Sequence, residues 1–217
     1  MKRYGIERRQ FMQYMAAVSA IPTFATAVDG YVEKNPVFKK NPFTLSVASG
    51  DPEPNGVVIW TRLSESPLIG EVTLNTAIEV EWEIAHDEGF KSIANKGIAL
   101  AVPQLGHSVH VEVEGLEPDR WYFYRFHTGS ETSPTGRTRT TPEKHVLPQR
   151  MQFAFTSCQH YETGDFNGYP HMIQEDLDLI IHLGDYIYEY AGVDNRVRKH
   201  LGKEIESLAN YRQRYAQ

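Results

Sequence analysis

The stretch Leu177–Tyr190, LDLIIHLGDYIYEY, decides how the second half of the chain is expected to fold. Its aliphatic run lacks the alternation of a half-exposed strand, so it predicts a parallel strand buried on both faces. Gly184 and Asp185 end that run. Ligand sites in open α/β sheets lie beyond the carboxyl ends of strands, where a glycine lets the backbone approach a ligand closely. Asp185 is therefore a candidate catalytic carboxylate, although a strand-end Gly-Asp can also be a plain turn.

A second strand is predicted upstream, and it ends at the single cysteine of the chain. Met151–Thr156 is the expected strand, and Tyr169–Asp176 is an expected short helix before the strand Leu177–Leu183. Strand, crossover helix and strand form the start of a βαβ unit. If the two strands are adjacent and parallel, Cys158 and Asp185 lie about 5–10 Å apart at one edge of the sheet. That separation suits a metal centre.

The candidate ligands are anionic donors. The Cys158 thiolate, the Asp185 carboxylate and the Tyr188 phenolate together suit trivalent, Lewis-acidic iron better than zinc. Such an ion lowers the pKa of its ligands, so a tyrosine can bind as phenolate, and Asp185 can reach a second metal with its other oxygen. Two plainer interpretations remain open: Cys158 as a small buried apolar residue, and Tyr186, Tyr188 and Tyr190 as a strand extension with a solvated aromatic face.

The region from 43 to 142 predicts a β-sandwich of the fibronectin type III or immunoglobulin kind. Short alternating or β-branched runs are separated by clusters of Pro, Gly and Asn, which is typical of sandwiches with one solvated face per sheet. Tyr122 follows a Leu116-Glu117-Pro118 turn and is expected to form the tyrosine corner of such domains, with its hydroxyl bonded back to the turn. The expected strands are Phe43–Val47, Val57–Thr61, Glu79–Ala85, Val109–Val113 and Trp121–His127.

Residues 1–27 predict an export signal. A basic segment precedes a moderately apolar run and an Ala25-Thr26-Ala27 cleavage pattern, and this run is too short and too interrupted for a stable membrane span. Arg8-Arg9-Gln10-Phe11-Met12 resembles a twin-arginine signal, which predicts export by that machinery to the periplasm or the exterior. The alternative is an ordinary secretory signal with two chance arginines. Residues 28–42 are expected to be an irregular linker.

Composition limits the class of partner. The 217 residues carry a formal net charge of −6, and the absence of a basic cluster gives no apparent nucleic-acid-binding surface. One cysteine in an exported chain has no partner for an intramolecular disulfide. Cys158 is therefore buried and inert, paired with another chain, or used in a site.

The motifs resemble those of the PhoD-like family of alkaline phosphatases and phosphodiesterases. The similarity runs from about Phe43 to the end of the chain. Its motifs are Val47–Pro52, Val58–Arg62, Phe155–Gln159, Asp176–Glu189 and Ser207–Ala216. The resemblance implies an α+β, two-domain protein: the sandwich at 43–142, then from 150 to 217 the start of an α/β calcineurin-like metallophosphoesterase domain. Ser157-Cys158-Gln159 stands where the wider superfamily has Asp-x-His, as in the PhoD branch.

The resemblance also implies a metal centre of iron(III) and calcium. Cys158 and Tyr188 would bind iron, and Asp185 would bridge iron to calcium. The implied reaction is the hydrolysis of phosphate mono- or diesters by in-line attack of a metal-bound hydroxide or oxide. Later metal motifs of the family are absent, so the chain is expected to be the N-terminal part of a longer protein and to be inactive alone. The alternatives are a non-catalytic exported binding module with a vestigial α/β segment, and a phosphodiesterase or phospholipase of the same fold.

Overall fold

The computed structural model describes residues 32–70 and 74–217, so the predicted export signal lies outside the described residues. The chain divides into two compact units. The first contains the described residues up to Leu63 and those from Leu74 to Thr141. The second contains the described residues 64–70 and Pro142–Gln217. By its contacts, the short segment that begins at Ser64 belongs with the second unit, and the boundaries 43–142 and 150–217 stay a prediction.

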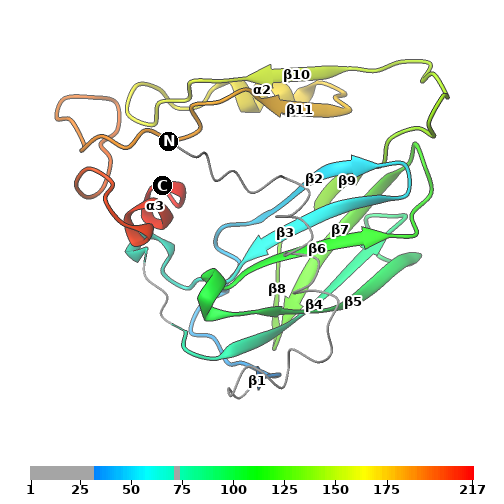
Figure 1. The fold of residues 1–217 in the computed structure, drawn as a ribbon, viewed down its shortest axis with the longest axis horizontal. Coiled ribbons are helices and arrows are strands. Elements are labelled where there is room, and N and C mark those ends of the chain that lie inside the picture. The colour runs from blue at the N-terminus through cyan, green and yellow to red at the C-terminus, as the bar shows by residue number, and fades with distance from the viewer. Residues whose placement is uncertain (1–31, 71–73) are drawn as a thin grey trace, which may run out of the picture. The chain divides into compact units, whose positions relative to one another are not determined.

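The larger sheet of the first unit is built around β4, Ala77–Ala85, which pairs antiparallel with β5 on one side and β7 on the other. β1 runs parallel to the start of β4, while β8 and β9 both pair with β7 (Figure 1). The strands are β1 Val32–Glu33, β5 Ile93–Ala101, β7 Trp121–Thr128, β8 Glu131–Thr132 and β9 Gly136–Arg139.

The smaller sheet of the first unit is antiparallel, with β3 between β2 and β6. These strands are β2 Val47–Glu53, β3 Gly56–Arg62 and β6 Ser108–Glu114. Alternate residues of both sheets point into one hydrophobic core, as the burial of Ile59, Val80 and Phe126 shows. The predicted β-sandwich is confirmed.

Tyr122 forms the predicted tyrosine corner. Its side chain is fully buried, and its hydroxyl accepts a hydrogen bond of 2.8 Å from the backbone N–H of Glu117. Leu116, at the start of the turn, is also buried in the core. The bond gives the backbone N–H of the turn a hydrogen-bond partner in place of water. It also fixes the position at which β7 enters the sheet.

Three local predictions in the first unit are wrong. The expected linker 28–42 contains β1, whose two residues pair with β4. The strand expected at Phe43–Val47 begins only at Val47, and it continues to Glu53 through a stretch with Gly and Pro that was expected to separate strands. Within this stretch Asp51 has a φ of 44°, and the pairing register shifts between Gly50 and Glu53. β5 was not predicted, because its larger apolar residues, such as Ile98, face solvent while alanines face inward. β2 and β5 each pair with the neighbouring strand along the chain, and β1 pairs with the more distant β4. In all three elements strand pairing outweighs local pattern.

The second unit begins with the predicted βαβ arrangement. β10, Phe153–Thr156, pairs in parallel with β11, Leu179–His182, in an unbroken register from Phe153 opposite Leu179 to Thr156 opposite His182. The crossover contains α2, Gly168–Gln174. The fold class predicted from sequence, a β-sandwich followed by the start of an α/β domain, is therefore confirmed.

The burial predicted for the strand Leu177–Leu183 is wrong in the described chain, since Ile180 is 51% exposed and Ile181 is 38% exposed. On the neighbouring strand, Phe155 is 63% exposed. β10 and β11 pair only with each other among the described strands, and a two-stranded sheet with one short crossover helix has too little surface to cover both faces. The aliphatic run of β11 therefore has the pattern of a strand covered on both faces, although several of its side chains are exposed in the described chain.

The last helix, α3, covers Leu208–Tyr215, about half of the range Leu201–Tyr215 that apolar residues at helical spacing predict. Ser207 caps it: its hydroxyl accepts a hydrogen bond of 3.2 Å from the backbone N–H of Asn210, which defines the first turn. Gly202, with a φ of 83°, lies in the irregular segment before the cap. Gln213 on this helix donates to the carbonyl of Leu68, which ties the segment from Ser64 to the second unit.

None of the helices in residues 32–70 and 74–217 is both long enough and apolar enough to span a membrane.

Candidate metal centre

The candidate site lies where β10 and β11 end. Backbone hydrogen bonds continue beyond both strands: the N–H of Cys158 donates to the carbonyl of Gly184 at 3.0 Å, and that of Gln159 donates to Asp185 at 3.2 Å. Cys158 and Asp185 have φ values of 55° and 53°. Such left-handed backbone is strained for residues other than glycine and concentrates at functional sites. Both turns are held by the paired strands, which places the two side chains together.

One carboxylate oxygen joins the three predicted ligands. Asp185 Oδ2 lies 3.5 Å from the Sγ of Cys158 and 3.2 Å from the hydroxyl of Tyr188. Cys158 and Asp185 are exposed, and Tyr188 is half-buried. The structure therefore brings together all three residues that the sequence singled out, and the cluster is open to an ion or a substrate. This openness also removes the interpretation of Cys158 as a buried apolar residue within the described chain.

The electrostatics of the cluster favour a cation. Desolvation, together with the Asp185 carboxylate and the nearby Cys158, raises the pKa of Tyr188 to about 12. The neutral phenol is therefore the stable form while only protein groups surround it. A metal ion among the three donors would reverse this effect, because its positive charge favours thiolate and phenolate over thiol and phenol.

Two neighbouring residues support the cluster, and sequence reasoning missed both. The side-chain carbonyl of Gln159 accepts hydrogen bonds from the hydroxyl of Tyr169 and from Nε2 of His182, the latter at 3.1 Å. The ring of His160 stacks on Tyr188, with ring centroids 4.5 Å apart. Gln159 belongs to the motif Ser157-Cys158-Gln159 singled out in the sequence, although no role was assigned to it, and the only signal for His160 was its place two residues after Cys158.

A second group that the sequence reasoning missed adjoins the first. His160, Glu162 and His200 lie close enough that their ligand atoms are all within 4.8 Å of one another. Glu162 and His200 come from irregular segments without periodic spacing, so no pattern in the sequence indicates that they meet. Glu162 is buried at 1% exposure, which is exceptional for a carboxylate.

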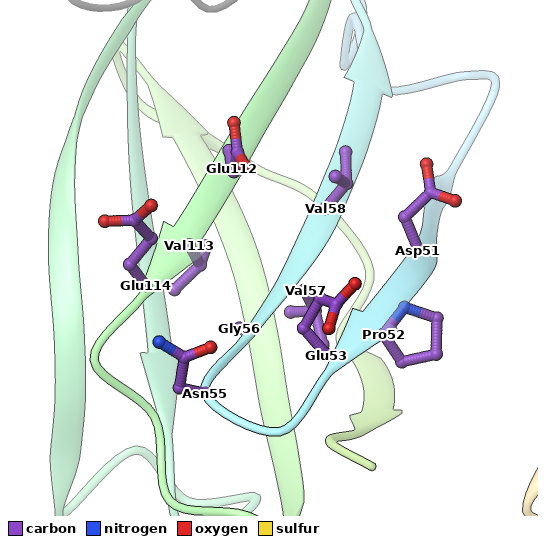
Figure 2. Close-up of a pocket in the computed structure, with 10 residues that line it drawn as sticks. All are labelled: Asp51, Pro52, Glu53, Asn55, Gly56, Val57, Val58, Glu112, Val113 and Glu114. Atoms are coloured by element: carbon purple, nitrogen blue, oxygen red, sulfur yellow. The ribbon is translucent and has the colours of Figure 1, made fainter. Parts of the chain in front are cut away.

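The sandwich contains a shallow hollow that differs in chemistry from these groups. Figure 2 shows it between the β2–β3 hairpin and β6, with Asp51 and Glu53 on one side and Glu112 and Glu114 on the other. Its lining contains no histidine, cysteine or tyrosine. Carboxylates alone at a solvated surface do not define a site, so the strand ends of the second unit remain the candidate centre.

Fold and site together define a class of two-unit protein, in which a β-sandwich precedes an α/β unit whose strand ends gather a thiol, a carboxylate and a phenol. Residues 29–142 match the family model described as the PhoD-like phosphatase N-terminal domain, and residues 153–217 match the model described as PhoD-like phosphatase. The chain belongs to the PhoD-like phosphatase family.

Two relatives give the similarity in numbers. The chain is 47% identical over 220 residues to alkaline phosphatase D of Bacillus subtilis (strain 168), an alignment that covers 97% of this chain and 38% of the relative. A solved structure described as that of PhoD matches with a TM-score of 0.81 and 50% identity, over 83% of this chain and 36% of that chain. The chain thus spans less than two fifths of the length of these relatives.

Proposed function

We propose that this chain is the N-terminal part of an exported, metal-dependent hydrolase of phosphate mono- or diesters. Membership of the PhoD-like phosphatase family and 47% identity to an alkaline phosphatase D support the reaction class. The observation that carries the proposal is the convergence of Cys158 and Tyr188 on a single oxygen of Asp185. A packing role would not need an exposed carboxylate held in left-handed backbone at that point.

The donor set fits iron(III) together with calcium. Cys158 and Tyr188 would hold the iron, because thiolate and phenolate stabilise a trivalent ion. Asp185 would bridge iron to calcium, a hard ion that prefers oxygen ligands. Desolvation is the largest cause of the raised pKa of Tyr188, and the Asp185 carboxylate and Cys158 add to it. A cation would relieve the part that comes from these two groups, which supports the fit.

The residues of this chain would position the ions and leave access for the ester. When bound, the paired cations supply Lewis-acid stabilisation of the charge that develops on phosphate oxygens. Asp185, at the strand end, would hold both ions through its two carboxylate oxygens. His160 packs against one face of the Tyr188 ring and limits its rotation, while the exposure of Cys158 and Asp185 leaves room for substrate.

The export route is part of the same proposal. Arg8-Arg9-Gln10-Phe11-Met12 supports recognition by the twin-arginine machinery, which carries proteins already folded, often with a metal inserted, to the periplasm or beyond. A cofactor assembled before transport is protected from competition among metals outside the cytoplasm.

Iron loading tests the ligand set directly. The purified chain with iron(III) is expected to show a visible phenolate-to-iron charge-transfer band. Tyr188→Phe should remove the band, whereas Tyr186→Phe, two residues away and exposed, should retain it. A colourless protein that binds zinc in preference to iron, or an identical spectrum for both variants, would reject the proposal.

A further inference from the structure

The cluster of His160, Glu162 and His200 has the composition of a metal site in its own right. Two imidazoles and one carboxylate form the ligand set of zinc sites that keep a fourth position open. Glu162 and His200 are buried at 1% and 4% exposure, while His160 is half-buried. Exposed acidic groups often gather without an ion, but this cluster is mostly withdrawn from water.

His200 presents an unused ligand atom. Its Nδ1 lies 3.0 Å from Oε1 of Gln217, and an amide oxygen there requires the proton on Nδ1. Nε2 is then a bare lone pair, and this buried atom has no hydrogen-bond partner among the described residues. Metal-binding histidines typically donate their other N–H to an oxygen in this way, which fixes the tautomer and aims the lone pair.

Glu162 is anchored so that one oxygen remains available. Its Oε1 accepts hydrogen bonds of 2.9 Å from the backbone N–H groups of Val193 and His200. These bonds hold the carboxylate in place. The other oxygen, Oε2, faces Arg196 at 3.3 Å.

Arg196 neutralises the cluster in the absence of an ion. Its Nη1 lies 3.3 Å from Oε2 of Glu162 and 3.4 Å from Nε2 of His160. Both contacts are longer than the roughly 2.8 Å of a strong charge-assisted hydrogen bond. The Arg196 side chain is 36% exposed, so it can turn toward solvent when another cation enters.

We propose that His160, Glu162 and His200 bind a divalent transition-metal ion, of which zinc is the expected species, at a site separate from Cys158, Asp185 and Tyr188. Arg196 competes with that ion for the buried carboxylate. Tetrahedral zinc holds its ligand atoms about 3.4 Å apart. The ligand atoms of the cluster, which lie within 4.8 Å of one another, draw closer when the ion binds. The half-buried His160 provides that movement. The inference does not depend on the proposed phosphatase function.

Cobalt(II) and zinc titrations of the purified chain test the site. Cys158→Ser is the background, because it removes the thiolate of the other centre. One Co²⁺ ion is expected to bind with the visible bands of tetrahedral nitrogen and oxygen ligands and without a thiolate charge-transfer band. Zn²⁺ should displace it.

Variants in that background distinguish a site from a fold defect. His200→Ala and Glu162→Gln should weaken Co²⁺ binding at least tenfold, while His171→Ala, a histidine on α2 outside the cluster, should not. Arg196→Gln should tighten binding, a gain that misfolding cannot produce. Absence of binding in the background, binding unaffected by His200→Ala, or no tightening with Arg196→Gln would each overturn the inference. An iron band that fails to form, with cobalt binding intact, would count against the proposed function alone.

Discussion

The hydroxyl of Tyr188 donates to Oδ2 of Asp185 across 3.2 Å, and this bond places a phenol beside a carboxylate at the end of a parallel strand. After desolvation, the carboxylate is the next cause of the raised pKa of Tyr188. In the metal-free chain, Asp185→Asn is therefore expected to lower that pKa from about 12 toward the ordinary value of a tyrosine. Ultraviolet absorbance followed against pH measures the ionisation of the tyrosines. The difference between proteins with and without Tyr188→Phe gives the contribution of Tyr188. Asp176→Asn, an exposed carboxylate paired with Arg150, serves as control, and an equal shift in that control would contradict the assignment.

The tyrosine corner should stabilise the sandwich measurably. Tyr122→Phe removes the acceptor of the Glu117 N–H and is expected to cost about 0.5–1.5 kcal/mol, because a partly buried hydrogen bond is lost. Tryptophan fluorescence during denaturant unfolding reports on this unit, since Trp60, Trp82 and Trp121 all lie within it. Tyr190→Phe, at an exposed tyrosine of the second unit, should leave that transition unchanged. An unchanged midpoint for Tyr122→Phe would refute the role of the hydroxyl.

A charge cluster on the larger sheet makes stability depend on pH. Burial opposes ionisation of Glu83, but hydrogen bonds from Arg125 and His127, at 2.6 Å and 3.1 Å, prevail and lower its pKa. A lowered carboxylate pKa contributes stability that is present above the unfolded-state value and is lost as the pH falls through the folded-state value. Glu83→Gln should therefore cost about 1 kcal/mol at pH 7 and progressively less in acid.

Denaturant unfolding at pH 7 and pH 3 checks this dependence. Glu81→Gln, two residues earlier on the same strand and exposed, provides the matched control and should have little effect at either pH. A stability difference for Glu83→Gln that persists undiminished at pH 3 would show that shape, and not charge, is responsible.

Gly136 allows an aromatic ring to lie across its strand. A Cβ atom at this position would come within 2.3 Å of Cζ of Tyr124, its partner in the pairing of β7 and β9. Gly136→Ala is expected to destabilise the sandwich by about 1–3 kcal/mol, because a buried ring has to move. Gly50→Ala, where nothing lies within 4 Å of the added atom, is the control, and equal midpoints for the two variants would contradict the prediction.

The 217-residue chain is expected to show no enzyme-like hydrolysis of p-nitrophenyl phosphate, even with iron and calcium. The described residues supply three proposed ligands: Asp185, and Cys158 and Tyr188, which both contact it. Three ligands are too few for two metal ions, because each ion needs several ligands of its own. Colorimetric release of nitrophenol measures this. Turnover that is lost with Asp185→Asn would show that these residues suffice.

The sequence predicted what depends on local pattern. Asp185 and Cys158 could be placed together because the carboxyl ends of parallel strands meet at one sheet edge, and Tyr122 could be assigned from the turn before it. Glu162 and His200 could not be found in this way, since they meet through irregular segments and are held by backbone donors that carry no side-chain signature. β5 escaped prediction for a related reason: its apolar residues do not mark the buried face.

The uncovered pair of β10 and β11 has a consequence for handling the protein in solution. Each strand has one edge without a partner among the described strands, and Phe153, Phe155 and Ile180 are all more than half exposed. Open strand edges with apolar side chains recruit further strands from other molecules. Self-association at high concentration should therefore begin at this sheet, and a lysine in place of Phe155 would act as a gatekeeper that keeps preparations monomeric.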